Sequence, residues 1–237
     1  MQSNRSFLND YFCFTMGKDK LARFAAIKSF ENVLEYQRNQ PFPLSGNWTR
    51  DFFKNDQPLI IELGCGKGEY SVGLAKMYPN KNFIGLDIKG NRIFIGARQA
   101  LKEKMTNVGF LRTRIDFIEA LFGPNEVDEI WLTFSDPQPQ KPKKRLSSPI
   151  FINRYQKILK PGGSIHMKTD NDLLFQYTLE QIEEHGYSII DYRPDLYQSL
   201  ETETNPTLKQ IFSIKTHYEQ LFYGKGHIIK YVSFKIN

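Results

Sequence analysis

An acidic residue and three alternating glycines follow an apolar run near residue 60. The run Leu59-Ile60-Ile61 leads into Glu62, and the glycines are Gly64, Gly66 and Gly68. Glycines allow positive φ angles and let a ligand lie directly against the main chain. Their spacing matches neither the G-x-G-x-x-G of dinucleotide-binding loops nor the G-x-x-x-x-G-K-S/T of phosphate-binding loops. We therefore expect a strand, a glycine loop and a helix that bind another nucleotide-like ligand.

A second acid, Asp87, ends the next apolar segment, residues 82–87. A carboxylate at the tip of a second strand can accept hydrogen bonds from both ribose hydroxyls of an adenosine. NAD and S-adenosylmethionine share that group, whereas two buried strands with turn glycines would need no ligand at all. Glu62, the glycine loop and Asp87 together resemble the cofactor motifs of class I methyltransferases. This favours S-adenosylmethionine as the cofactor.

The third cofactor position departs from this pattern. Class I methyltransferases often carry an aspartate after the third strand, and it receives the adenine amino group. Ungapped spacing places Arg114 there, and Asp116 follows two residues later. The resemblance assigns Arg114 to the cofactor site by position only. It leaves open whether Arg114, Asp116 or the main chain contacts adenine.

Asp136 follows a fourth β-prone segment, residues 128–134, and precedes Pro137 and Pro139. A proline-rich turn with an incidental acid is the alternative interpretation. In many amino- and base-methylating enzymes, however, an Asp/Asn-Pro-Pro-aromatic loop at this place grips the nitrogen that is methylated. We therefore expect Asp136 at the mouth of the cofactor crevice.

A basic run comes directly after this loop and comprises Lys141, Lys143, Lys144 and Arg145. A solvated surface would also account for such a run. Beside a methyl-transfer point, cations that can bind phosphates favour a nucleic-acid substrate over a small molecule.

Three segments in this order carry a resemblance to one family. Residues 134–145 are similar to the F-P-D-P-W-P-K-K-R segment of the bacterial tRNA (guanine-N7-)-methyltransferases of the TrmB type. Residues 168–170 match the K-T-D of that family, and residues 216–219 match its T-x-Y-E. The resemblance covers roughly residues 20–237, and the combination of motifs is specific although each one is modest.

The resemblance implies a role for each matching residue. Asp136 is then the catalytic acid and also a cofactor contact, beside Glu62, the glycine loop and Asp87. The implied substrate-binding residues are Gln140, Lys141, Asp170, Thr216 and Glu219, and the implied RNA contacts are Lys143, Lys144 and Arg145. Two departures affect the substrate contacts, because Gln138 replaces the tryptophan of the family and Gln140 replaces a lysine.

The implied reaction is methylation of guanine N7 in tRNA, in the variable loop by family resemblance. N7 has a free lone pair and can attack the sulfonium methyl without first losing a proton. No metal is needed for such a displacement. A methyltransferase that acts on another RNA or a small molecule, and a non-catalytic RNA-binding protein on a relic fold, are the alternatives. The intact cofactor motifs argue against the last of these.

The elements that must position these residues alternate between strand and helix. The patterns predict strands over 59–63, 82–87, 108–111 and 128–134, and helices over 69–78, 91–105 and 116–122. This order is typical of a doubly wound α/β fold with a mostly parallel sheet. The class I resemblance implies seven strands, the last one antiparallel, near residues 227–234. We expect a methyltransferase domain over 56–237, and before it a basic N-terminal extension, 1–55, partly helical over 19–37 and mobile at its start.

Composition sets the broad class. The chain has 237 residues, 40% of them hydrophobic and 24% charged, and a formal net charge of +6. These are ordinary values for a globular protein, and the excess of basic residues is a weak pointer to nucleic acid. Cys13 and Cys65 are far apart, and a disulfide at Cys65 would obstruct the glycine loop, which favours reduced thiols. No signal peptide or membrane span is evident, so we expect a cytoplasmic protein, monomeric or homodimeric.

Overall fold

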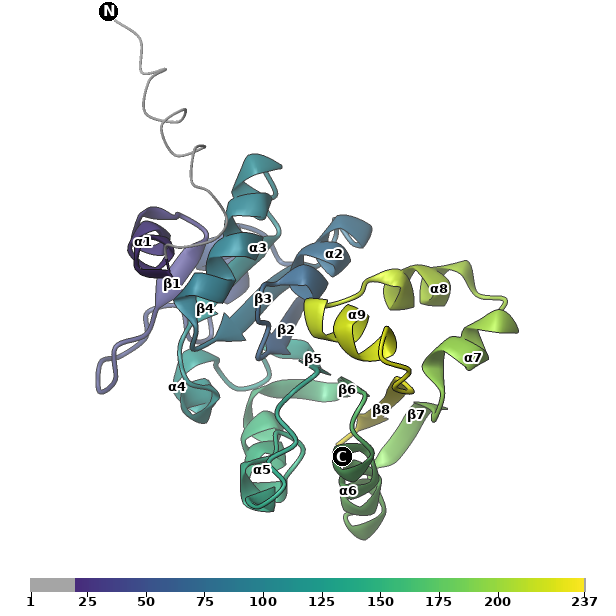
Figure 1. The fold of residues 1–237 in the computed structure, drawn as a ribbon. Coiled ribbons are helices and arrows are strands. Elements are labelled where there is room, and N and C mark those ends of the chain that lie inside the picture. Colours follow the sequence, from purple (N-terminus) through teal and green to yellow (C-terminus); the bar gives the residue numbers. More distant parts are fainter. Residues whose placement is uncertain (1–19, 237) are drawn as a thin grey trace, which may run out of the picture.

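The computed structural model describes residues 20–236. The predicted mobile start of the chain and Cys13 lie outside these residues. Within them, a single twisted sheet forms the centre of the molecule, and helices cover both of its faces (Figure 1).

The described part of the chain contributes eight strands to this sheet, in the order β1-β4-β3-β2-β5-β6-β8-β7. The neighbours from β1 to β6 run parallel, and β8 runs antiparallel to both β6 and β7. In chain order the strands are Val33–Glu35 (β1), Leu59–Leu63 (β2), Asn82–Asp87 (β3), Val108–Arg112 (β4), Val127–Thr133 (β5), Leu159–Thr169 (β6), Ser188–Arg193 (β7) and Lys230–Lys235 (β8).

The helices are short to medium in length, and none between residues 20 and 236 is long and apolar enough to cross a membrane. The α-helices are Lys20–Ala26 (α1), Glu69–Met77 (α2), Gly90–Lys102 (α3), Ile118–Leu121 (α4), Pro149–Ile158 (α5), Asp172–Glu184 (α6), Leu196–Glu201 (α7), Pro206–Ser213 (α8) and His217–Tyr223 (α9). Shorter helical segments are Ile27–Ser29 (η2), Trp48–Phe53 (η3), Ile115–Phe117 (η4) and Pro142–Lys144 (η5).

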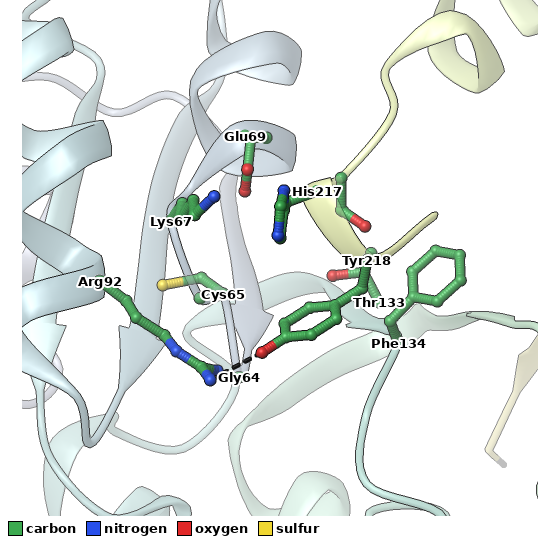
Figure 2. A pocket seen from close by; sticks show the side chains of 11 residues that line it. Gly64, Cys65, Lys67, Glu69, Arg92, Thr133, Phe134, His217 and Tyr218 are labelled. Carbon is green, nitrogen blue, oxygen red and sulfur yellow. Dashed lines mark hydrogen bonds between the residues drawn. The ribbon is translucent and has the colours of Figure 1, made fainter. Parts of the chain in front are cut away.

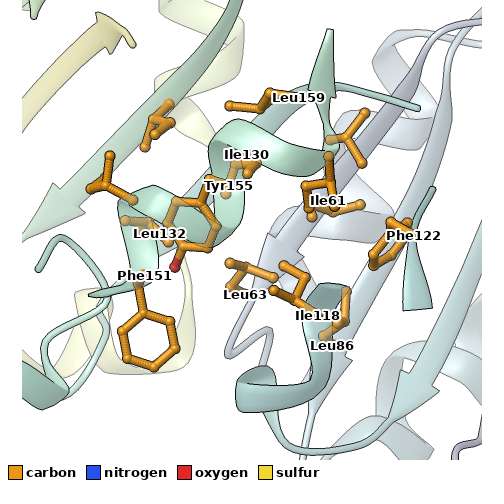
Figure 3. Packing of buried hydrophobic residues seen from close by; sticks show 14 of the residues in the cluster. Ile61, Leu63, Leu86, Ile118, Phe122, Ile130, Leu132, Phe151, Tyr155 and Leu159 are labelled. Carbon is orange, nitrogen blue, oxygen red and sulfur yellow. The ribbon is translucent and has the colours of Figure 1, made fainter. Parts of the chain in front are cut away.

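Strand β2 shows how the sequence builds the two faces of the core. Leu59, Ile61 and Leu63 point to the face that α4, α5 and α6 cover, where Tyr155 of α5 packs among them (Figure 3). Ile60 points to the opposite face, which α2 and α3 cover. Alternate side chains of a strand lie on opposite faces, so an unbroken apolar run marks a strand buried on both sides. Each such side chain contributes about 1.5–3 kcal/mol by its burial.

The order of the strands reverses between β2 and β5. The chain moves outward from β2 through β3 to β4, then crosses back so that β5 pairs with β2 on its other side. In an open α/β sheet, the crevice at the carboxyl ends of the strands at this reversal is where ligands bind. The glycine loop follows β2 and the Asp136 loop follows β5, so both predicted loops meet at this crevice.

The predicted fold class is confirmed, with two corrections near the N-terminus. The single helix predicted over 19–37 is wrong, because the described part of this segment ends its helix early and continues as β1. Val33 is buried and pairs with Phe110, and Glu35 forms an ion pair with Arg112 at 2.9 Å. The sheet therefore has eight strands instead of the predicted seven. Pairing with β4 holds residues 33–35 as a strand, a tertiary effect that local patterns do not record.

Candidate active site

The glycine loop leaves open space at two of its three glycines. Gly64, Gly66 and Gly68 have φ angles of +81°, +57° and +74°, a region that side chains disfavour. A Cβ atom on Gly68 would lie 2.5 Å from the Phe110 ring, so this glycine allows helix α2 to pack on the sheet. A Cβ atom on Gly64 or Gly66 would meet nothing within 4 Å. These two glycines therefore present bare main chain to a ligand, which fits the predicted cofactor.

Asp87 fixes the conformation of this loop. Its carboxylate accepts hydrogen bonds from the main-chain N–H of Gly66 at 2.9 Å and of Lys89 at 2.7 Å. The side chain is mostly buried at the tip of β3. A carboxylate has about four acceptor positions, so two remain for the hydroxyl groups of a ligand.

Glu62 lies behind the loop and joins three elements. One carboxylate oxygen accepts from the main-chain N–H of Ser71 at 2.9 Å and from its hydroxyl at 2.5 Å, and the other accepts from the Thr133 hydroxyl. The side chain of Glu62 on β2 thereby holds α2 and β5 together. Burial raises the pKa of Glu62 to about 7, although the hydrogen bonds from Ser71 and Thr133 oppose this shift.

Stability should therefore depend on pH through Glu62. The pKa of its carboxyl is ordinarily 4.5 and about 7 in the folded protein, so between these values the folded state binds more protons than the unfolded state. The free energy of unfolding then falls as pH rises through this window, by about 3 kcal/mol for this group. We expect Glu62→Gln to remove most of this loss, as urea unfolding at pH 5 and pH 8 would measure. Glu119→Gln at the surface is the control, and equal pH dependence in E62Q and the unmodified protein would contradict the prediction.

The Asp136 loop leaves β5 through a strained residue. Phe134 has a φ angle of +51°, which is costly for a side chain of this size, and its N–H donates to the carbonyl of Lys168 at 2.8 Å. Asp136 itself is exposed and accepts from the N–H of Gln138 at 3.0 Å. Arg145 is buried, and its Nε donates to the carbonyl of Pro137 at 2.9 Å. Arg145 therefore stabilises the conformation of this loop. The RNA contact predicted for Arg145 stays a prediction.

A cavity of about 180 Å³ lies between the glycine loop, the end of β5 and helix α9. Its walls include Gly64 and Gly66 on one side, Phe134 on another, and His217 and Tyr218 on α9 (Figure 2).

A hydrogen bond crosses this cavity between two helices. Arg92 of α3 donates to the Tyr218 hydroxyl of α9 at 2.7 Å (Figure 2). The Arg92 guanidinium carbon also lies 5.4 Å from the centre of the Tyr218 ring, within the range of a cation–π contact. An aromatic ring and a cation thus lie together in the wall of this cavity.

The K-T-D and T-x-Y-E segments contact each other through buried charges. Lys168 of β6 forms an ion pair with Glu219 of α9 at 2.6 Å, and both side chains have 0% exposure. Thr216 caps α9, since its hydroxyl accepts from the N–H of Glu219 at 3.1 Å. Asp170 is partly buried near His227, with 3.5 Å between Oδ2 and Nδ1. Asp136 and Asp170 follow neighbouring parallel strands and so lie at the same edge of the sheet.

The other predicted residues lie on the surface. Gln140, Lys141, Lys143 and Lys144 are exposed on the segment that follows Asp136. Arg114 forms an ion pair with Asp116 at 2.9 Å, and 60% of its side chain is exposed. It does not line the cavity described above. The roles predicted for these residues stay predictions.

Several residues that line the cavity, or that contact its walls as Lys168 does, were not assigned a role from the sequence. Lys168 and Tyr218 lie inside the motifs quoted above, so a signal existed although neither was assigned a role. Thr133 lies within the predicted strand 128–134, next to the Asp136 loop. Nothing in the sequence indicated a role for Arg92, since one arginine in an amphipathic helix is ordinarily a surface residue. Over residues 20–236, no group of His, Cys, Asp and Glu side chains could hold a metal ion.

The fold and the site together define an α/β protein of the class I methyltransferase type. Residues 56–232 match the model of the family described as "Putative methyltransferase". A tRNA (guanine-N(7)-)-methyltransferase of Bacteroides thetaiotaomicron is 48% identical, covering 93% of this chain and 87% of that protein. One of Christiangramia forsetii is 45% identical, covering 92% and 98%. The chain therefore belongs to the tRNA (guanine-N(7)-)-methyltransferase family, as its motifs predicted.

Solved structures agree on the fold at much lower identity. The crystal structure of the 16S rRNA methyltransferase KamB matches with a TM-score of 0.60 at 14% identity, over 79% of this chain and 92% of that one. The structure of an antibiotic-related methyltransferase matches with a TM-score of 0.55 at 16% identity, over 82% and 95%. Both confirm the predicted class I methyltransferase fold.

Proposed function

We propose that this protein transfers a methyl group from S-adenosylmethionine to N7 of a guanine in tRNA. The observation that carries the proposal is the meeting of the open glycine loop with the Asp136 loop at the point where the strand order reverses. Membership of the family supports the same reaction, because its members named above carry that activity in their names. With a tRNA substrate, the protein would act in the cytoplasm.

The reaction depends on the positioning of the reactants and on electrostatic stabilisation more than on acid–base chemistry. The N7 lone pair forms a bond to the methyl carbon while the bond from carbon to sulfur breaks, and the products are 7-methylguanine and S-adenosylhomocysteine. The positive charge of the sulfonium moves onto the base in this step. A carboxylate near the base stabilises that charge, and a fixed loop holds N7 in line. Asp136 is exposed on the loop that follows β5, and hydrogen bonds from Gln138 and Arg145 hold this loop.

Carboxylates also suit the choice of guanine. The N1–H and the N2 amino group of guanine are donors on one edge, and adenine does not offer this pair. Asp136 and Asp170 follow adjacent strands at the same edge of the sheet and present acceptors there. The base must leave its stack to reach the crevice, which costs a few kcal/mol. Contacts in the site and phosphate contacts outside it must recover this cost.

The exposed lysines after the Asp136 loop are suited to phosphate binding. Replacing Lys141, Lys143 and Lys144 together with alanine should raise the KM for tRNA about 10-fold and reduce the salt dependence of log KM by a slope of about 2. The matched control replaces Lys76, Lys102 and Lys104 on and after the last turns of α2 and α3, at the opposite edge of the sheet. Steady-state kinetics at several salt concentrations measure both variants. Equal effects of the two triple variants would contradict a specific RNA contact.

One experiment tests the proposed reaction directly. The purified protein is incubated with S-adenosylmethionine labelled in the methyl group and with unmodified bulk tRNA. The labelled RNA is then cleaved chemically at 7-methylguanine to map the site. Label at a single guanine supports the proposal and also shows whether that guanine is in the variable loop. Measurable cofactor binding without transfer to tRNA would contradict it and would favour another RNA or a small molecule as the acceptor.

A further inference from the structure

Helix α9 forms one wall of the cavity, yet apolar burial does little to hold it there. Its N-terminal end supplies His217 and Tyr218 to the cavity. Tyr218, Leu221 and Tyr223 of this helix are 37%, 43% and 46% exposed. The buried residue of α9 is Glu219, a carboxylate. A seven-residue helix is too short to be stable alone, so its tertiary contacts must fix its place.

The carboxylate of Glu219 is bound by three groups within the protein. It pairs with Lys168 Nζ at 2.6 Å, accepts from the N–H of Thr216 at 3.3 Å, and accepts from the Tyr197 hydroxyl. Its side chain has 0% exposure. A group with these partners and no open face has no surface to offer to a base in the crevice.

Lys168 connects this carboxylate to the Asp136 loop. It pairs with Thr133 in the register of β5 and β6, and its carbonyl accepts from the N–H of Phe134 at 2.8 Å, where the chain turns toward Asp136. Its side chain crosses to Glu219. One residue therefore holds two walls of the cavity, the Asp136 loop through its main chain and α9 through its side chain.

We propose that Lys168 and Glu219 are positioning residues that set helix α9 against the glycine loop. The family resemblance assigns Glu219 to substrate binding. On this proposal, which rests on the proposed function, Glu219 acts on the substrate and the cofactor only through the placement of α9. The pair suits this task because each buried charge depends on the other, so that removal of either partner is strongly unfavourable.

This role is tested by neutralising Glu219 and Lys168 singly and then together. Glu219→Gln and Lys168→Met each leave one buried charge without its partner. The double variant leaves none, and the glutamine side chain that it introduces on α9 can still complete the cap with Thr216. We expect each single variant to raise the Kd of S-adenosylhomocysteine and the KM of tRNA about 10-fold, and the double variant to return both to within about 3-fold of the unmodified protein.

A direct contact between Glu219 and the substrate gives a different result. The Kd of S-adenosylhomocysteine would then stay unchanged in E219Q, only the KM of tRNA would rise, and the double variant would show no recovery. That outcome overturns the proposal. The Kd is measured without tRNA, so failure of the protein to methylate tRNA would count against the proposed function and not against this placement of α9.

A milder variant keeps the test decisive if the charge variants do not fold. Tyr197→Phe removes one hydrogen bond to Glu219, and Tyr197 does not line the cavity. We expect it to raise the Kd of S-adenosylhomocysteine about 3-fold, as loss of about 0.7 kcal/mol would. The control is Glu203→Gln, which weakens a pair with Arg193 at 2.7 Å elsewhere in this region. An unchanged Kd in Y197F, or an equal rise in E203Q, overturns the proposal.

Discussion

Asp136→Asn is expected to lower kcat about 100-fold or more while cofactor binding stays within about 3-fold of the unmodified protein. Asparagine has the same shape, and its side-chain oxygen can still accept from the N–H of Gln138, so the loop should keep its conformation. Only the negative charge is lost. A factor of 100 corresponds to about 2.7 kcal/mol, a usual cost for removing one preorganised electrostatic contact to a transition state.

Single-turnover methylation of tRNA and titration with S-adenosylhomocysteine measure these two quantities separately. Asp51→Asn is the matched control. It makes the same change in net charge, and the Asp51 carboxylate pairs with Arg50 at the surface. A D136N protein with an unchanged kcat would show that Asp136 plays no part in catalysis. A large loss of cofactor affinity would instead show that its main contact is with the cofactor, which the family resemblance also implies.

Asp87→Asn is expected to raise the Kd of S-adenosylmethionine about 100-fold. The carboxylate accepts from the N–H groups of Gly66 and Lys89, and an asparagine would turn its own NH₂ group toward one of these donors. The variant therefore loses one of the two acceptors left for ribose and also loosens the glycine loop. Each charge-assisted hydrogen bond contributes about 1.5–3 kcal/mol, so loss of one or two of them accounts for the expected change.

Calorimetric titration with S-adenosylmethionine and S-adenosylhomocysteine measures this effect. The control, Asp116→Asn, removes an acid near the same edge of the sheet that forms an ion pair with Arg114. We expect its Kd to change by less than about 3-fold, because exposed ion pairs contribute little. A weaker affinity in D116N would instead identify Asp116 as a contact of the cofactor. An unchanged Kd in D87N would contradict the assignment of Asp87 to the cofactor site.

Local patterns predicted the central sheet well and its edges poorly. Strand β2 runs over Leu59–Leu63 as predicted, and helix α2 ends one residue before its predicted end. A continuous apolar run closed by glycines has few local alternatives, which explains this agreement. Strand β1 was missed because Val33 and Leu34 become a strand only when β4 lies beside them. The short helices between Leu196 and Tyr223 were also not predicted, since their contacts are distant in sequence.

The family and the cofactor loop could be predicted from the sequence alone. The ordered motifs around Gly64, Asp136 and Lys168 are local in the chain, and glycine at a positive φ angle or an acid at a strand end can be recognised without knowing its neighbours. The contacts that bury polar side chains were seen only in the tertiary structure. The resemblance implies a substrate contact for Glu219 and an RNA contact for Arg145, and both stay predictions. The structure adds that Glu219 pairs with Lys168 and that Arg145 donates to the carbonyl of Pro137. The physical reason is that burial and charge pairing join residues that are distant in the chain, and no local pattern records them.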